Sequence, residues 1–223
     1  MKLLLNASAG VLALAMSASA NAQLIFSIDD LNDGAAATIV ADGGPGDNFA
    51  GVEGFLDFNG AVGSWIFNDV TAFGSPVIGG PNEDIVHLDS VNVSSDNGGL
   101  LTLMLTQTDL TKSVAPFMAS FGGSTSGSIS YQLFVDSTNA AFGNEFMLYD
   151  SSIDMSGAFA NNFAGDFTLP GMYSMTMVVT INHTGRSVTS FNYEVAIPEP
   201  TSLALLGGGL ILIGFAGRIR EKA

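Results

Sequence analysis

The chain has 223 residues, of which 21 are acidic and 6 are basic, and its formal net charge is −15. An acidic excess of this size excludes nucleic acid as a partner, because phosphate binding needs clustered Lys and Arg. The chain contains no cysteine, which excludes disulfides, thiol catalysis and iron–sulfur sites.

The first 22 residues have the pattern of a secretory signal peptide. Lys2 precedes an apolar stretch at residues 3–16, and Ala20 and Ala22 fit the small-x-small rule for cleavage before Gln23. We therefore expect the protein to be exported, and we expect the mature chain to begin at Gln23.

Residues 23–197 have the length of one domain and are sufficient to bury a core. Their basic residues are Lys112 and Arg186, against 19 acidic residues that are spread along the chain as on a solvated surface. Apolar and polar residues alternate at period two, which is the pattern of strands with one buried face. We expect strands near residues 24–28, 37–40, 54–59, 62–73, 85–93, 101–106, 117–121, 128–135 and 145–149.

Strands at this spacing, divided by Gly-rich turns, predict an all-β fold, namely an antiparallel β-sandwich with a jelly-roll-like arrangement. The alternation is clearest at residues 173–181 and 188–195, and the turn residues between them predict that these two strands pair as a hairpin. Residues 151–169 are the least regular. Phe159, Phe163 and Phe167 are four residues apart, which is compatible with one helical turn or with two short strands.

A single transmembrane helix is expected near the C-terminus. Residues 203–217 are apolar and uncharged, and a helix over residues 201–219 would reach roughly 28 Å, close to the roughly 30 Å of a bilayer core. Arg218, Arg220 and Lys222 follow this stretch and would anchor that end in the cytoplasm, which leaves residues 23–197 outside.

Pro198, Glu199 and Pro200 lie directly before the apolar stretch, and the prolines favour an extended backbone there. A Pro-Glu-Pro motif, a short transmembrane helix and a basic tail resemble, in this order, the PEP-CTERM protein-sorting signal, here at residues 198–223. An ordinary anchor that is never cut is the alternative, although such an anchor does not need the Pro-Glu-Pro motif.

The resemblance implies a substrate of an exosortase-type transpeptidase in a Gram-negative bacterium that makes exopolysaccharide. It implies that export machinery delivers the chain to the inner membrane, where the tail holds it transiently. The chain would then be cut near the motif and passed to the cell surface or the extracellular matrix, with exopolysaccharide as a further partner.

Calcium is the metal that the sequence of residues 23–197 favours most. Asp30, Asn32, Asp42 and Asp47 place oxygen ligands on Gly-containing turns, which suits calcium. Their spacing does not match an EF-hand, however, and Asp, Asn and Gly are common in turns that bind nothing. We therefore assign no metal or other cofactor and keep these four residues as candidates for a structural calcium site.

The sequence predicts no catalytic residue. His87 and His183 are isolated from other metal-ligand residues, so we expect structural or surface roles for them rather than zinc binding. Trp65, the only tryptophan, is expected in the core, with stacking on a sugar ring as the alternative. Among 19 acidic residues some pair will always lie close together, so acidity alone does not predict a glycosidase site.

Three functions are compatible with these observations. The first is an exported, non-catalytic protein of the cell surface or extracellular matrix that contributes to the exopolysaccharide layer. The second is a carbohydrate-binding or adhesive module on the same scaffold, which a strip of exposed aromatic side chains would favour. The third is a secreted hydrolase, which would need a pocket with convergent, perturbed carboxylates, and the sequence offers no motif for one.

Overall fold

The computed structural model describes residues 23–79, 83–112, 114–153 and 156–198. In these ranges the chain forms twelve β-strands and no helix, which confirms the expected all-β class. The part of the chain that the structure describes accordingly has no helix with the length and apolar character to span a membrane. The expected signal peptide and C-terminal helix lie outside these ranges.

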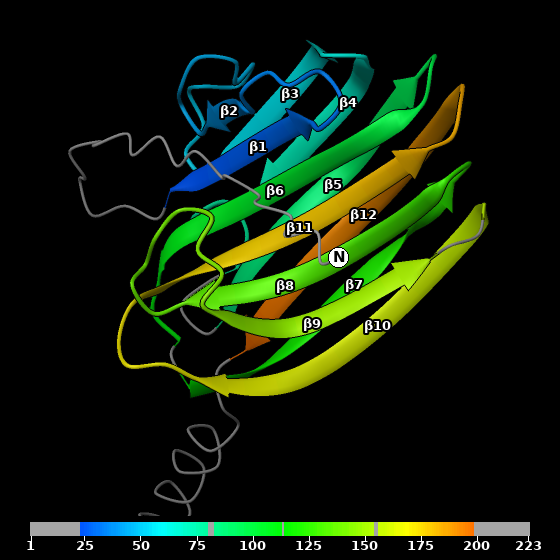
Figure 1. Ribbon diagram of the computed structural model, residues 1–223. Coiled ribbons are helices and arrows are strands. Elements are labelled where there is room, and N and C mark those ends of the chain that lie inside the picture. The colour runs from blue at the N-terminus through cyan, green and yellow to red at the C-terminus, as the bar shows by residue number, and fades with distance from the viewer. Residues whose placement is uncertain (1–22, 80–82, 113, 154–155, 199–223) are drawn as a thin grey trace, which may run out of the picture.

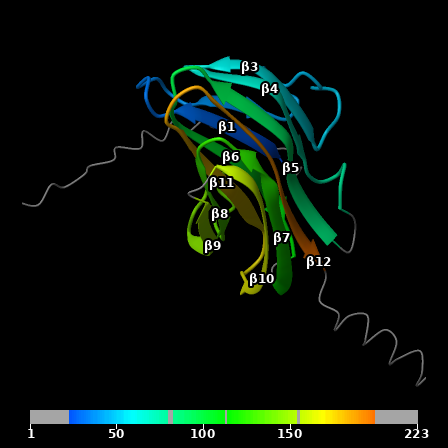
Figure 2. The same ribbon diagram turned by 90° about the vertical axis from the view of Figure 1, so that its right-hand side faces the viewer.

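The strands form two six-stranded antiparallel sheets that stack face to face (Figure 1, Figure 2). Sheet A has the order β2 (Thr38–Ala41), β1 (Leu24–Asp30), β6 (Gly99–Leu110), β11 (Tyr173–His183), β8 (Ser128–Asp136) and β9 (Phe146–Ile153). Sheet B has the order β10 (Gly157–Thr168), β7 (Val114–Thr125), β12 (Ser187–Pro198), β5 (Glu83–Ser95), β4 (Trp65–Phe73) and β3 (Phe55–Val62). The expected antiparallel sandwich is therefore confirmed, and its finer jelly-roll arrangement stays a prediction.

The core lies between the two sheets and follows the period-two pattern of the sequence. On β11, the alternate residues Tyr173, Met175, Met177, Val179 and Ile181 are fully buried, in one cluster with apolar side chains of β12. Trp65 is also fully buried, which confirms its core interpretation and excludes sugar stacking for this side chain.

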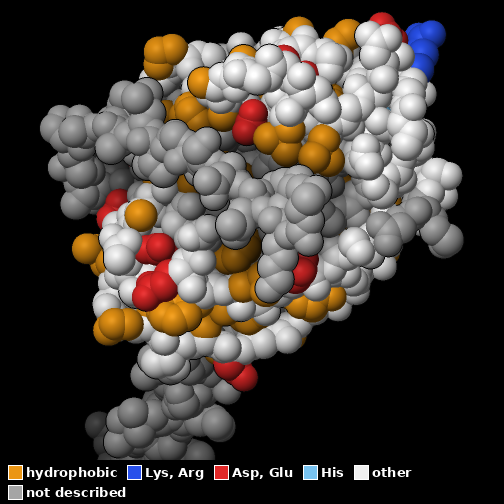
Figure 3. All heavy atoms as spheres, viewed as in Figure 1, with side chains coloured by type: hydrophobic (Ala, Val, Ile, Leu, Met, Phe, Trp, Pro, Cys, Tyr) orange, Lys and Arg blue, Asp and Glu red, His pale blue; other side chains and the backbone are white. Residues whose placement is uncertain are grey.

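The surface of sheet A carries scattered acidic side chains among apolar ones, and basic side chains are visible only at one corner (Figure 3).

The predicted hairpin of residues 173–181 and 188–195 is wrong. The two segments are strands, but β11 pairs with β6 and β8 in sheet A, whereas β12 pairs with β5 and β7 in sheet B. The turn between them carries the chain from one sheet to the other. Alternation identifies a buried face but not a hydrogen-bonding partner, because both faces across the sandwich bury the same kind of residue.

Residues 157–168 form the single strand β10, so neither interpretation of the phenylalanine spacing is correct. Residues four apart share one face of a strand as well as one side of a helix, and Phe159, Phe163 and Phe167 lie on the inner face of β10. The exposed face carries Ala158, Ala160 and other small residues, which hides the usual contrast between apolar and polar positions.

His183 ends β11 inside the sandwich, with 2% of its surface exposed. Its Nδ1 lies 3.0 Å from the hydroxyl of Ser95 and its Nε2 lies 2.8 Å from that of Thr189, while its ring packs 4.7 Å from that of Trp65. The side chain thus ties β11 to strands of sheet B. Burial lowers the pKa of His183 below its ordinary value of 6.5, because charge is disfavoured there.

Protonation of His183 is expected to destabilise the fold. A lowered folded-state pKa means that this stabilising contribution is complete above pH 6.5 and is lost as the pH falls below it. In His183→Asn, the free energy of unfolding should be lower by about 1–3 kcal/mol at pH 7, because buried polar partners lose their bonds. The free energy of unfolding of His183→Asn, measured by denaturant unfolding, should also decline less between pH 7 and pH 5 than that of the wild type. Equal declines in the two proteins would contradict this role of His183.

Candidate functional site

A continuous row of outward-facing side chains crosses all six strands of sheet B. Strand register places these residues opposite one another, and the core residues of each strand point to the other side. The row, which we call the sheet B row, consists of Asn162, Ser120, Glu194, His87, Phe73 and Phe55, in the order β10, β7, β12, β5, β4 and β3.

One end of the sheet B row is aromatic. The rings of Phe55 and Phe73 are half-buried and 4.8 Å apart, and Phe49, which is 54% exposed, packs edge-on at 5.2 Å from Phe55. The ring of His87 lies 6.2 Å from that of Phe73. Partly exposed rings on a sheet face offer a planar apolar surface on which a ligand ring can stack.

The middle of the row is charged. His87 lies between two carboxylates, with its Nδ1 3.7 Å from Oε2 of Glu194 and its Nε2 3.8 Å from Oδ1 of Asp89. All three side chains are partly exposed. The two contacts are ion pairs when His87 carries a proton. When His87 is neutral, the three side chains offer hydrogen-bonding groups, and the two carboxylates give the cluster a net negative charge.

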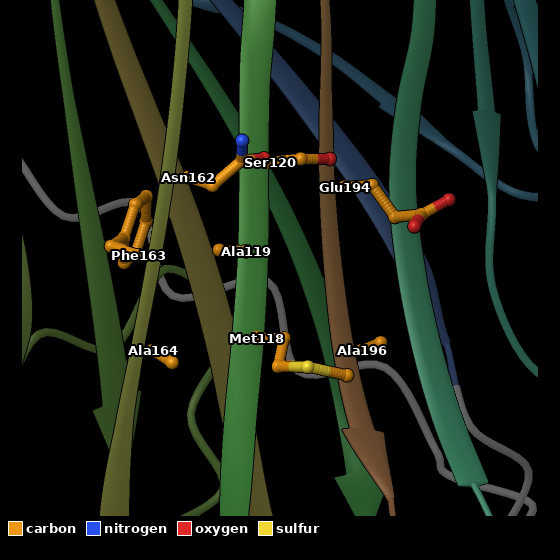
Figure 4. Close-up of a pocket in the computed structure, with 8 residues that line it drawn as sticks. All are labelled: Met118, Ala119, Ser120, Asn162, Phe163, Ala164, Glu194 and Ala196. Atoms are coloured by element: carbon orange, nitrogen blue, oxygen red, sulfur yellow. The ribbon is translucent and has the colours of Figure 1, made fainter.

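The other end of the row opens into a shallow hollow of about 440 Å³. Figure 4 shows Met118 lying across toward Ala196, and Glu194 pointing away from the hollow toward β5. The lining side chains come from the three strands β10, β7 and β12. Its lining residues are Met118, Ala119, Ser120, Asn162, Phe163, Ala164, Glu194 and Ala196.

The sheet B row and the hollow offer side chains that can contact a ligand. Glycoside hydrolysis uses two carboxylates on either side of the scissile bond, and the hollow is lined by a single one, Glu194. The aromatic end, the charged middle and the polar end can instead contact a ligand that lies flat across the strands.

Sequence reasoning missed the sheet B row because its members come from six strands that are far apart in the chain. The alternation of apolar and polar residues in β3 and β4 does contain a signal that could have identified part of the row. Phe55 and Phe73 occupy the outward positions of β3 and β4, next to the buried Leu56 and Ala72, where a polar residue is expected. Adjacent aromatic residues on the solvent face of neighbouring strands form an apolar patch, and such patches mark interaction sites.

Two of the calcium candidates, Asp30 and Asn32, hold a turn at the end of β1. Asp30 Oδ1 accepts hydrogen bonds from the backbone N–H and the side-chain amide of Asn32, at 3.1 and 2.8 Å. Its Oδ2 accepts from the N–H and the hydroxyl of Ser64, both at 2.8 Å. Burial acts to raise the pKa of Asp30, but these bonds outweigh it and hold the pKa at about 2, below the ordinary 3.8.

The other two candidates, Asp42 and Asp47, hold the loop between β2 and β3. Asp47 accepts from the N–H groups of Phe49 and Gly43, both at 2.9 Å, and Asp42 accepts from the N–H of Gly54 at 2.6 Å. Among the described residues, no three or more His, Cys, Asp or Glu side chains group so that they could hold a metal. The observed bonds favour the turn interpretation, and the calcium site stays a prediction.

The structure reaches only the borders of the predicted sorting and cleavage sites. Pro198 is the last residue of β12 and pairs with Glu83 of β5, so the first proline of the motif still belongs to sheet B. Gln23 directly precedes β1, and its backbone N–H donates to the hydroxyl of Thr108 at 3.2 Å. The remaining predicted residues, Ala20, Ala22, Glu199, Pro200, Arg218, Arg220 and Lys222, lie outside the described residues.

Comparison with known families assigns the C-terminal segment. The family model of the PEP-CTERM protein-sorting motif matches residues 196–220. A search of the curated proteins found no match.

Comparison with solved structures finds proteins of low similarity. TmCBM61 in complex with beta-1,4-galactotriose has a TM-score of 0.36 and 9% identity, over 60% of this chain and 88% of that one. The K1 cleaved adhesin domain of Lys-gingipain from Porphyromonas gingivalis W83 has a TM-score of 0.35 and 16% identity, over 66% of this chain and 98% of that one. TmCBM27, described as recognising mannan, has a TM-score of 0.29 and 10% identity, over 64% of this chain and 95% of that one. Scores at this level assign neither a ligand nor a family.

Asp30 is expected to stabilise the fold through its four hydrogen bonds. Asp30→Asn leaves donors of Ser64 or Asn32 without an acceptor, so the free energy of unfolding at pH 7 should fall by about 1–3 kcal/mol. Because the folded-state pKa is lowered, the wild-type advantage is present above pH 3.8 and lost as the pH falls toward 2. Asp96→Asn, which removes an exposed carboxylate paired with Arg186 at 3.4 Å, is the control; equal losses in both variants would contradict this role.

Proposed function

We propose that this chain, which carries a PEP-CTERM sorting motif at residues 196–220, is a non-catalytic protein of the cell surface or extracellular matrix. The motif indicates an exported protein that is processed by an exosortase through a membrane-anchored precursor. In the proposal, the precursor is held in the inner membrane of an exopolysaccharide-producing Gram-negative bacterium. After cleavage, the β-sandwich remains in the exopolysaccharide layer as the functional part.

The observation that carries this proposal is the position of the motif at the end of β12. This strand lies inside sheet B and pairs along its length with β5 and β7. Its last residue is Pro198, and all twelve described strands precede the rest of the motif. A cut after Pro198 therefore removes no strand, so the sandwich can be released folded.

The shape of the surface supports a non-catalytic role. The hollow of sheet B is open and shallow, and Glu194, the only lining residue with a titratable side chain, points that side chain away toward β5. General acid–base chemistry needs positioned groups that converge on a reacting atom. The lining lacks such a constellation.

Intact-mass analysis of protein from the inner membrane and from the matrix tests the proposal. Matrix material should begin at Gln23 and end near Pro198, whereas the membrane precursor should retain the tail. A matrix mass that still includes residues 218–223 would contradict sorting and would indicate a permanent anchor.

A pair of tail variants separates motif recognition from tail charge. Glu199→Ala combined with Pro200→Ala should retain the tail and accumulate in the inner membrane, because the extended motif is lost. Glu221→Gln changes one charge of the same segment outside the motif and should be cut like the wild type. If both are cut equally, the Pro-Glu-Pro motif does not direct cleavage.

A second candidate function, glycan binding, is favoured by the sheet B row. The row combines partly exposed Phe55 and Phe73 with the hydrogen-bonding groups of His87, Glu194 and Asn162. Neighbouring strands are about 4.8 Å apart, so the contacts repeat at a spacing similar to the length of one sugar ring. A polysaccharide chain lying across the strands would meet the aromatic end and the polar end at once.

Charge restricts the class of glycan. Residues 23–197 contain 19 acidic and 2 basic residues, and the charged middle of the row holds Glu194 and Asp89. An acidic surface repels polyuronates and favours neutral or amino-sugar polysaccharides. We therefore expect a neutral or cationic glycan as the ligand of this face.

Affinity electrophoresis in gels containing a neutral β-glucan, chitosan or alginate tests this second candidate. The wild type should be retarded by the β-glucan or by chitosan and not by alginate. Phe55→Ala with Phe73→Ala should weaken binding about tenfold, or about 1.4 kcal/mol, because two stacking surfaces are lost. Ile66→Ala removes a 47% exposed side chain from β4 outside the row and should bind normally; equal loss in both variants, or retardation by alginate alone, would overturn the assignment.

A further inference from the structure

The four sheet edges differ in how well they are protected against pairing with another strand. An exposed edge offers unpaired N–H and C=O groups, and proteins blunt such edges by shortening, bulges or charge. β2 has only four residues, and the pairings of the edge strands β3 and β9 with their neighbours are interrupted by register shifts. β10 has none of these features: its twelve residues pair with β7 without a shift.

The sequence of β10 also contains few protective residues. It contains no Pro, Lys or Arg, and its only charged residue is Asp166, near its end. Residues 157–165 are neutral in a segment that otherwise carries a large acidic excess. This neutral stretch therefore lets two strongly acidic copies approach with little local repulsion.

The residues of β10 are arranged almost symmetrically about Asn161. A second copy of the strand, placed antiparallel on a twofold axis through Asn161, pairs each residue with a partner of the same kind at nearly every position. The resulting pairs are Gly157 with Gly165, Ala158 with Ala164, Phe159 with Phe163, Ala160 with Asn162, and Asn161 with itself.

We propose that two copies of this protein associate through β10, which joins their B sheets into one antiparallel sheet across a twofold axis. An interface on such an axis is isologous, because each copy contributes the same patch. Backbone hydrogen bonds supply the pairing, and the near-symmetric side chains fix its register.

Packing at the inner face supports this pairing. Phe163 stacks on Tyr149 at a ring separation of 3.6 Å, and Phe159 stacks on Phe121 at 5.1 Å. Phe159 and Phe163 are nonetheless only half-buried, because none of the described strands lies beyond β10. In the dimer, Phe159 of each copy would oppose Phe163 of the other copy, so that the two aromatic clusters become one and the exposed parts of the rings are covered.

The outer face of β10 allows a close approach. Ala158, Ala160, Asn162 and Ala164 are exposed there and carry only short side chains. A twofold axis perpendicular to the joined sheet keeps the outer faces of both B sheets on the same side. The two sheet B rows would then lie nearly end to end, since each reaches the axis at Asn162.

A charge swap on this exposed face tests the dimer without disturbing the core. In Ala160→Lys with Asn162→Lys, two pairs of like charges oppose each other across the axis, and dimerisation should weaken by about tenfold or more. In Ala160→Glu with Asn162→Lys, each acid opposes a base of the partner copy, so the dimer should persist. The two variants change the same positions, and circular dichroism would verify that both fold.

Sedimentation equilibrium of the mature exported protein gives the readout. The wild type and the opposite-charge variant should sediment as dimers, and the like-charge variant should dissociate to monomers. A wild type that stays monomeric at its highest soluble concentration would overturn the proposal. So would a dimer that both variants retain equally, because its interface would then lie elsewhere.

Thiol cross-linking tests the register, since the chain has no cysteine of its own. A mixture of Ala158→Cys and Ala164→Cys proteins, treated with a short bis-maleimide, should yield cross-linked heterodimers. Each variant alone should yield far less, because its own thiols lie at opposite ends of the paired region. Equal yields in all three samples would exclude the register about Asn161.

Discussion

The structure depends on one packing constraint, which is that β11 and β12 lie inside opposite sheets and bury their inner faces together. The short turn after His183 carries the chain across the sandwich instead of returning it along the same sheet. With no disulfide to hold the sheets, this apolar contact and the bonds of His183 to Ser95 and Thr189 join them. Because β12 is inside sheet B, its outward residues lie at the centre of a broad face.

That placement links the proposed functions to one sheet. Glu194 of β12 is in the middle of the sheet B row, and Ala196, Ile197 and Pro198 of the same strand are the first residues of the segment that is matched to the sorting motif. At the other side, β10 contributes Asn162 to the row, and its outer edge pairs with no other strand in the part of the chain that the structure describes. A protein held in a matrix through a glycan gains avidity when two binding faces are joined, because the second contact becomes intramolecular. Sorting, binding and self-association are thus compatible on a single scaffold.

Sequence patterns were reliable where a local rule decides the outcome. Alternation at residues 173–181 predicts a strand with one buried face, and Trp65 was expected in the core, as observed. The hairpin and the phenylalanine spacing show the limit of such rules. The pairing of β11 depends on β6 and β8, and a spacing of four fits a helix and a strand alike. The candidate calcium residues show the same ambiguity, since turns and metal sites use the same side chains.

The sequence by itself determined the all-β class, the buried face of most strands, the acidic surface and the C-terminal sorting motif, because each follows from composition or from neighbours along the chain. Only the tertiary structure decided which strands pair, that Phe55, Phe73, His87 and Glu194 form one row, and that β10 is an open edge. These features depend on register between strands that are distant in the sequence, and period-two alternation carries no information about the partner across a hydrogen bond.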